Sequence, residues 1–175
     1  MKTRKMELGE ITRVIDPIVA MRSNDWFLVS ATDAAGKTNA LTAAWGGFGN
    51  VCNKPTATIY IRPQRFTKRF IDESGRFTMT FFDFARYKGA LAYLGSHSGA
   101  DDPDKIRHAG LTLAALDGQP TYEEGRYAIL CKPFFSQQLA PEHFLDTRVA
   151  QEMYPDRDYS YLYLAEIEAA YEILR

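Results

Sequence analysis

The sequence predicts a mainly β domain, a single antiparallel barrel with a few short helices on its outside. Most apolar runs are short and rich in β-branched and aromatic residues, with polar or glycine-containing turns between them. Few segments have helical periodicity. The 175 residues suffice for one domain with a sizeable core. No repeat, low-complexity tract or linker divides the sequence, so residues 1–175 are expected to form a single domain.

The first half of the chain is expected to consist of strands joined by tight turns. Residues 26–32 and 39–45 predict a hairpin around a polar turn. The glycines of 46–49 then predict a flexible stretch that bulges or lets the backbone approach a ligand closely. Two more strands follow: a buried one over 57–61 and, from its strict apolar–polar alternation, a half-buried one over 76–81.

Three short helices are expected, because each segment has helical character and ends at a glycine. They cover 68–74 before Gly75, 85–94 before Gly95, and 104–109 before Gly110. The longest strand is expected over 126–136, and 162–174 offers one or two more. The segment 137–161 between them is a long excursion with a short helix near 147–153. Excursions of this length are usually lids, partner contacts or ligand walls.

Charge and cysteine content narrow the functional class. The formal net charge is −1, so no global field favours nucleic acid or an anionic membrane as a partner. Cys52 and Cys131 fit no CxxC pattern and no disulfide framework. Cys131 is expected to be a buried free thiol, whereas Cys52 could be exposed. The sequence has no signal-peptide pattern and no apolar run of membrane-spanning length, which predicts a cytoplasmic protein.

The most informative stretch is Arg62-Pro63-Gln64-Arg65-Phe66-Thr67, between an expected strand and an expected helix. Pro63 ends the strand because it has no N–H for a ladder. Two guanidinium groups and the Thr67 hydroxyl should then converge on free N–H groups at the helix start. Aligned amides, the helix dipole and bidentate arginine are how proteins hold a phosphate. The stretch therefore predicts a phosphorylated ligand, and the alternative is a solvated basic turn or surface ion pairs.

Other familiar motifs fail on spacing. Gly36-Lys37-Thr38 has the end of a P-loop, but Ala31 stands where the first glycine is needed. The histidines His97, His108 and His143 are too far apart for a zinc pattern, so no metal is expected. No serine or cysteine is visibly paired with a base, so no catalytic side chain is assigned.

Two further stretches have a functional and a structural interpretation. Thr42-Ala43-Ala44-Trp45 places small residues beside one large ring, which suits a flat ligand lying against exposed backbone. A tryptophan in a strand is more usually a core residue. Ser96-His97-Ser98-Gly99 predicts anion contact or simple helix-terminal capping about equally.

Four blocks together resemble the flavin reductase-like proteins, and the flavoredoxin group in particular. In chain order they are 39–47, 53–55, 61–67 and 95–99. The segments 144–146 and 154–159 share the resemblance, which covers almost the whole chain. It implies an FMN-binding split barrel, a Greek-key antiparallel barrel that forms homodimers with FMN near the subunit interface.

The resemblance also implies a cofactor site made of three parts of the sequence. The FMN phosphate would be held by Arg62, Arg65 and Thr67, with Pro63 and Gln64 in the same turn. The isoalloxazine ring would be lined by Thr42, Ala43, Ala44 and Trp45, in the block that begins at Asn39. Ribityl or phosphate would be contacted by Ser96, Ser98 and Gly99, in a block that includes His97, and by Asp102 and Lys105.

The implied function is that of an FMN-dependent oxidoreductase. NAD(P)H would be the electron donor, with hydride accepted at flavin N5 and passed on to a small-molecule or protein acceptor. One alternative is an FMN electron carrier without NAD(P)H activity. Another is a non-catalytic module that binds a phosphorylated small molecule, whereas the near-neutral charge disfavours a nucleic-acid-binding barrel.

Overall fold

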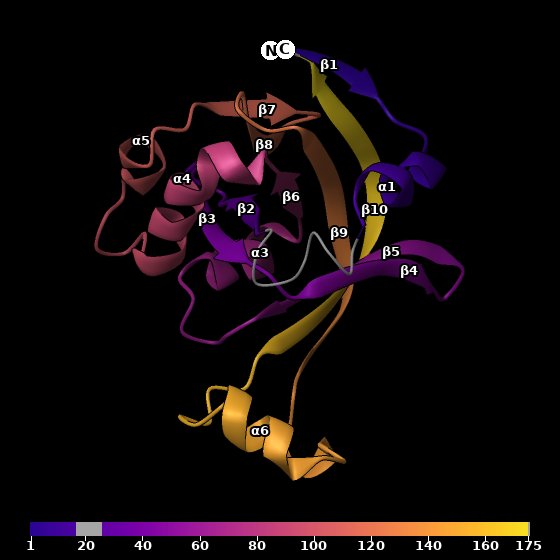
Figure 1. The fold of residues 1–175 in the computed structure, drawn as a ribbon, viewed down its shortest axis with the longest axis vertical. Helices are drawn as coiled ribbons and strands as arrows, with labels where there is room; N and C mark the ends of the chain where they lie inside the picture. The colour runs from indigo at the N-terminus through magenta and orange to yellow at the C-terminus, as the bar shows by residue number, and fades with distance from the viewer. Residues whose placement is uncertain (17–25, 175) are drawn as a thin grey trace.

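The computed structural model describes residues 1–16 and 26–174 and shows a mainly β architecture (Figure 1). The strands are β1 (Lys2–Lys5), β2 (Phe27–Thr32), β3 (Thr38–Ala43), β4 (Gly46–Val51), β5 (Lys54–Ile61), β6 (Phe77–Phe81), β7 (Leu113–Leu116), β8 (Gln119–Tyr122), β9 (Tyr127–Gln138) and β10 (Tyr161–Leu174). The helices are α1 (Leu8–Val14), α3 (Thr67–Ser74), α4 (Phe84–Ser96), α5 (Lys105–His108), α6 (Thr147–Met153) and the 3₁₀ turn η1 (Pro141–His143). No helix in the described ranges is long and apolar enough to span a bilayer.

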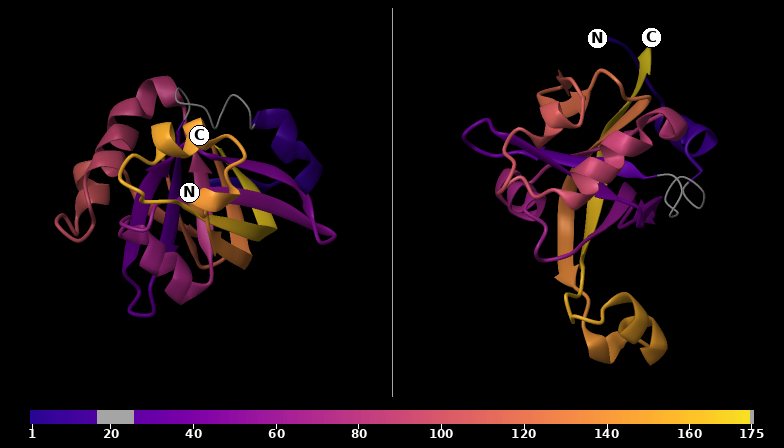
Figure 2. Two further views of the ribbon diagram at one scale, coloured as in Figure 1. Left: turned by 90° about the horizontal axis from the view of Figure 1, so that it is seen from below. Right: turned by 60° about the vertical axis from the view of Figure 1, so that its left-hand side comes forward.

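The main sheet has eight strands in the order β3-β2-β6-β9-β10-β5-β4, with β1 added on β10. Every neighbouring pair is antiparallel, and the sheet curls into a barrel (Figure 2). Its two end strands, β3 and β4, are consecutive in the chain and are joined by Ala44 and Trp45. In the described part of the chain each pairs on one side only, so the barrel is split between them.

The barrel core is formed by alternate residues of the strands, as the pleat requires. In β2, Phe27 and Val29 point into this core. Leu28 faces the other way and packs with Leu91 and Leu94 of α4 in a second cluster. Helix α4 therefore covers the outside of β2 and β3 close to the split.

Strand β6 is not the half-buried strand expected from its alternation, because all five of its residues are buried. Phe77 and Met79 lie in the barrel core. On the outer face, the Thr80 hydroxyl lies 3.2 Å from the Thr121 hydroxyl of β8. The β7–β8 hairpin covers that face, and paired hydroxyls let polar residues be buried there.

Three other expectations are wrong in detail. Residues 46–49 begin β4 instead of forming a flexible stretch, because β4 pairs with β5 through a turn in which Cys52 and Asn53 adopt φ of 54° and 57°. Gly95 does not end α4, which continues to Ser96. The longest strand is β10, with 14 residues against 12 in β9.

The predicted excursion is present as an arm, which we define as residues 139–160. It contains η1 and α6, and α6 spans the expected Thr147–Met153. The arm projects beyond the barrel at the end of the β9–β10 pair (Figures 1 and 2). The two thiols are also as expected, since Cys131 is buried and Cys52 is exposed.

Candidate functional site

A cleft of about 220 Å³ opens at the split of the barrel, and we call it the split cleft. Its lining residues come from the end of β3, the β3–β4 link, the end of β5 and the segments flanking β5 and β10: Leu41, Thr42, Ala43, Ala44, Trp45, Tyr60, Ile61, Arg62, Arg65 and Ser160. Strand register explains why they meet, because Gly46 pairs with Ile59 and Tyr161 pairs with Ile61.

The β3–β4 link presents backbone to this cleft. Ala43 and Ala44 have small side chains, and among the described strands β3 and β4 each have one edge without a neighbour. The Thr42 hydroxyl is already engaged, since it donates to the Leu91 carbonyl at 2.5 Å. Apart from Trp45, residues 42–45 can therefore meet a ligand mainly through their backbone.

Trp45 is not a core tryptophan. It is 40% exposed, and its ring meets the edge of the Tyr154 ring at 6.2 Å. The alternative that Trp45 is a core residue is thereby excluded. The exposed indole at the mouth of the cleft suits stacking or edge contact with a flat ligand.

The turn after β5 has the predicted layout but different capping. Pro63 is exposed just beyond the strand, and the Arg65 N–H donates to the Arg62 carbonyl at 3.1 Å. The N-cap of α3 is Phe66, without a side-chain cap bond. Thr67 is the first helical residue and is buried.

Three of the residues implied by the resemblance meet behind this turn. The Asn39 amide donates to the Thr67 hydroxyl oxygen at 3.2 Å, and both side chains are buried. A Cβ at Gly99 would lie 2.4 Å from Asn39 Oδ1, so a larger residue there would displace the Asn39 amide. These contacts lock β3, α3 and the loop after α4 together beneath the site.

Two cations converge on the C-terminal end of α4. Arg65 Nη1 donates to the Gly95 carbonyl at 2.7 Å. Lys105, only 2% exposed, places its Nζ 2.8 Å from the His97 carbonyl and 3.4 Å from that of Leu94. These carbonyls belong to the last turn of the helix, where main-chain acceptors lack helical partners.

The environment of both cations disfavours their charged forms. Burial, and then the positive charge of Arg65, lowers the pKa of Lys105 to about 8. Burial also lowers the pKa of Arg65. Within the described residues, neither cation forms an ion pair with a carboxylate. Helix carbonyls compensate only partly for two neighbouring positive charges, so an anion bound here would be stabilised.

Arg62 is engaged differently, because the structure places it on the arm. Its Nη1 pairs with Asp158 at 2.6 Å, and its Nη2 donates to the Met153 carbonyl at 2.8 Å. Its guanidinium also lies 5.2 Å from the centre of the Tyr154 ring. Gln64 donates to the same Asp158 oxygen at 2.6 Å. Arg62 and Gln64 therefore fasten the arm beside the cleft. Arg62 lines the split cleft together with Arg65, but its guanidinium bonds Asp158 and Met153 of the arm.

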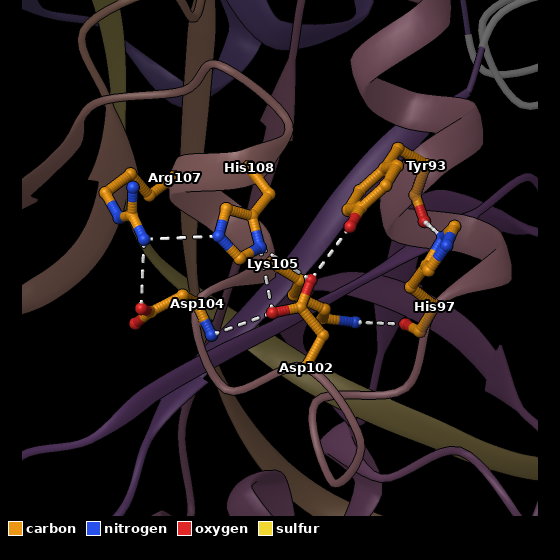
Figure 3. A network of polar contacts seen from close by, with 7 residues as sticks. All are labelled: Tyr93, His97, Asp102, Asp104, Lys105, Arg107 and His108. Atoms are coloured by element: carbon orange, nitrogen blue, oxygen red, sulfur yellow. Dashed lines mark hydrogen bonds and ion pairs between the residues drawn. The ribbon is translucent and has the colours of Figure 1, made fainter.

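Asp102 lies in a polar network that joins α4 to α5 (Figure 3). Its carboxylate accepts from the Tyr93 hydroxyl at 2.9 Å, pairs with His108 at 3.0 Å and accepts from the Asp104 N–H at 3.2 Å. The hydrogen bond from His108 is the largest of the effects that hold the pKa of Asp102 below its usual value. Asp102 thus fixes the short helix that carries Lys105.

The other polar side chains of this loop bond locally. The Ser96 hydroxyl donates to the Ala92 carbonyl at 3.0 Å, and the His97 ring stacks on Tyr93 at 3.9 Å. The Ser98 hydroxyl accepts from the Ala100 N–H at 3.2 Å. The Ser96 and His97 side chains are therefore engaged by α4, and the Ser98 hydroxyl by the backbone of its own loop.

A second cleft, of about 430 Å³, lies between Trp45 and the arm. It is lined mostly by apolar groups: Trp45, Gly46, Tyr60, Leu139, Phe144, Val149, Met153 and Tyr154. Trp45 and Tyr60 line both clefts, so the two clefts adjoin at these residues. Tyr163 is a core residue, and its hydroxyl donates a hydrogen bond to the Asp72 carboxylate at 2.6 Å.

Sequence reasoning missed four of the lining residues: Leu41, Tyr60, Ile61 and Ser160. Tyr60 lies within the strand expected over 57–61. Alternation along that strand places its side chain on the opposite face from Ile59 and Ile61. Ser160 has no local signal. Only the pairing of Tyr161 with Ile61 brings it to the cleft.

Comparison with known proteins gives no matching family model. An uncharacterized protein of Aeropyrum pernix is 28% identical over 128 residues, which is 72% of this chain and 45% of that relative. The chain thus spans less than half the length of the curated relative it matches.

Solved structures share the fold. The FMN-binding domain of a flavin reductase-like enzyme from Shewanella baltica superimposes with a TM-score of 0.69 at 24% identity, over 98% of this chain and 77% of that one. Flavoredoxin from Methanosarcina acetivorans gives 0.62 at 18% identity, over 84% and 68%. Flavoredoxin of Desulfovibrio vulgaris gives 0.61 at 24% identity, over 83% and 67%. The chain therefore has the FMN-binding split-barrel fold that these flavin reductase-like proteins and flavoredoxins share.

Proposed function

We propose that this chain binds FMN at the split cleft and acts as a flavin-dependent oxidoreductase. One observation carries the proposal: Arg65 and Lys105 are two partly or fully buried cations, held side by side without an ion pair to a carboxylate among the described residues. Arg65 also lines the split cleft, together with Trp45. A ligand with a phosphate at one end and a flat ring at the other fits this arrangement.

The residues present match the two chemical parts of FMN. Arg65, Lys105 and the start of α3 would hold the phosphate. The backbone of 42–45 would bond the polar edge of the ring, and Trp45 would contact its face or edge. Bound FMN supplies hydride and electron transfer, while the protein binds it, orients it and sets its electrostatics.

We extend the proposal to NAD(P)H as the electron donor, with a small molecule or a protein as acceptor. The apolar cleft between Trp45 and the arm supports this, because it offers space beside the proposed ring position. The cytoplasm is the proposed setting, and the free state of Cys52 and Cys131 agrees with a reducing compartment.

The test is a visible absorption spectrum of the purified, desalted protein, repeated after addition of FMN and then of NADPH or NADH without oxygen. We expect a retained yellow chromophore that bleaches with the nicotinamide. Retained flavin that does not bleach would favour an electron carrier reduced by another protein. No retention of FMN would overturn the proposal and leave only a barrel with an anion-binding turn.

We also propose that the chain forms a homodimer with FMN near the interface. Large apolar side chains are exposed on β9, on the arm and at the split: Phe134, Phe135, Leu145, Val149, Met153 and Trp45. Burial of such a surface in a partner subunit would remove it from water. Light scattering coupled to size-exclusion chromatography should give twice the monomer mass, and a monomer at micromolar concentration would contradict the proposal.

A further inference from the structure

Ser160 has a buried hydroxyl group without a hydrogen-bond partner. The residue is 1% exposed, and its Oγ has no partner among the described residues. Buried polar side chains nearly always have a partner, and an unsatisfied one costs free energy. The position itself is fixed, since the Ser160 carbonyl accepts from the Leu139 N–H at 2.9 Å.

The strand register places this hydroxyl at the split cleft. Tyr161 pairs with Ile61, so Ser160 stands beside Arg62 at the end of β5. On the other side of β5, the pairing of Gly46 with Ile59 brings the β3–β4 link to the same strand end. Ser160 and that link therefore flank one end of β5, and both line the cleft.

A ligand bound in the split cleft would give the Ser160 hydroxyl a hydrogen-bond partner. A second hydroxyl, that of Thr78 on β6, is also buried and has no partner among residues 1–16 and 26–174. Thr78 lies within the sheet, paired with Ser30 and Leu130 of the neighbouring strands, and lines none of the described clefts. Ser160 and Thr78 thus each have a buried hydroxyl without a partner among the described residues, but only Ser160 lines the split cleft.

We propose that the Ser160 hydroxyl hydrogen-bonds the riboflavin part of FMN, through a ring carbonyl, ring nitrogen or ribityl hydroxyl. This inference rests on the proposed function. The phosphate is assigned to Arg65 and Lys105, which sit at the C-terminal end of α4. Ser160 is instead beside Arg62, whose guanidinium is occupied by Asp158. The neutral hydroxyl thus faces the uncharged part of the ligand.

The test compares FMN and riboflavin binding by wild type and Ser160→Ala, followed by flavin fluorescence. Loss of one neutral hydrogen bond should weaken binding of both ligands about threefold to tenfold. The ligand-free protein should melt at an unchanged temperature or about 2 °C higher, because the substitution removes an unsatisfied buried group. Weaker binding by a protein that is no less stable would not follow from a packing defect.

Thr78→Val is the matched control, since it removes the other orphaned hydroxyl at nearly constant volume. It should leave both affinities unchanged. Equal binding by Ser160→Ala and wild type would overturn the inference alone, as would an equal loss in Thr78→Val. A loss confined to FMN would put the hydroxyl at the phosphate and also overturn it. Failure of the wild type to bind either flavin would instead overturn the proposed function, and this inference with it.

Discussion

At the scale of single residues, the three cations of the site differ in the groups that they bond. Arg62 has a carboxylate partner in Asp158 and a carbonyl partner in Met153. Arg65 and Lys105 have only carbonyl partners in the described part of the chain. A guanidinium with a carboxylate partner gains little from a phosphate, whereas one held by a carbonyl gains a full counter-charge. Arg65 is therefore the primary phosphate candidate of the two arginines.

Arg65→Ala should weaken FMN binding about 10-fold to 100-fold, because a charge-assisted hydrogen bond contributes about 1.5–3 kcal/mol. Riboflavin binding should change little, since riboflavin carries no phosphate. Fluorescence titration with both ligands measures this. Arg69→Ala is the control, because Arg69 is an exposed neighbour on α3 whose guanidinium lies over Phe66. Equal FMN affinity in Arg65→Ala and wild type would remove Arg65 from the site.

Lys105 gives the site a pH dependence whose sign is fixed by its lowered pKa of about 8. Below this pH the ammonium is charged and attracts phosphate; above it the charge is lost, so FMN affinity should fall between pH 8 and 9.5. The lowered pKa also means that the unfolded chain binds the proton more tightly, so this residue makes the ligand-free protein more stable as pH rises above 8.

Lys105→Met isolates this effect. At pH 7 we expect it to weaken FMN binding about 10-fold and to abolish the decline above pH 8. Riboflavin affinity serves as the reference across the same range, because it lacks the phosphate. The same decline in Lys105→Met as in wild type would assign the titration to another group.

At the scale of elements, the arm is fastened to the barrel beside the split cleft. Beyond the β9–β10 ladder, its contacts with the barrel centre on the Arg62–Asp158 pair and the Trp45–Tyr154 ring contact. The pair is partly buried, with side-chain exposures of 35% and 15%. Burial raises the pKa of Asp158, but hydrogen bonds from Gln64 and Arg62 outweigh it and hold the pKa below its usual range. The Arg62–Asp158 ion pair should therefore persist into mildly acidic solution.

Asp158→Asn should loosen the arm while leaving the barrel folded. Partial burial makes the interaction stronger than an exposed pair, so a double-mutant cycle with Arg62→Met should give a coupling of about 1–2 kcal/mol. Limited proteolysis should cut within the arm faster in Asp158→Asn. Arg148→Ala, which breaks the exposed Arg148–Asp146 pair of the same arm, should leave the cleavage rate unchanged. Equal cleavage of all three proteins would show that the pair does not hold the arm.

At the scale of the whole molecule, the proposed ligand would bridge the two edges of the split barrel and the arm. The split separates β3 from β4, and the arm lines the clefts from outside the sheet. A ligand that binds only the folded state stabilises it in proportion to the logarithm of its concentration.

At about 100 times its dissociation constant, FMN should therefore stabilise the protein by about 2.7 kcal/mol and raise the melting temperature by about 5–10 °C. Riboflavin at the same concentration should give a smaller rise, because it lacks the contact with Arg65 and Lys105. Differential scanning fluorimetry without fluorescent dye checks both. An unchanged melting temperature with FMN would contradict binding to the folded state.

Much of the fold could be predicted from local patterns. The β2–β3 hairpin, α3 closed by Gly75 in the left-handed region, and α6 over Thr147–Met153 all lie close to where they were expected. Each depends on interactions within a few residues, such as alternation, capping and a turn. The burial of both faces of β6 was not predictable in this way, because it depends on a hairpin about 40 residues later in the chain.

The same division applies to the site. By itself, the sequence determined a mainly β chain with a basic turn before a helix and a tryptophan beside small residues, since composition and short-range spacing encode these features. Only the tertiary structure decided that Arg62 pairs with the arm while Arg65 joins Lys105, and that Ser160 meets the β3–β4 link. Those choices are set by strand register and helix packing between distant segments, which no local pattern contains.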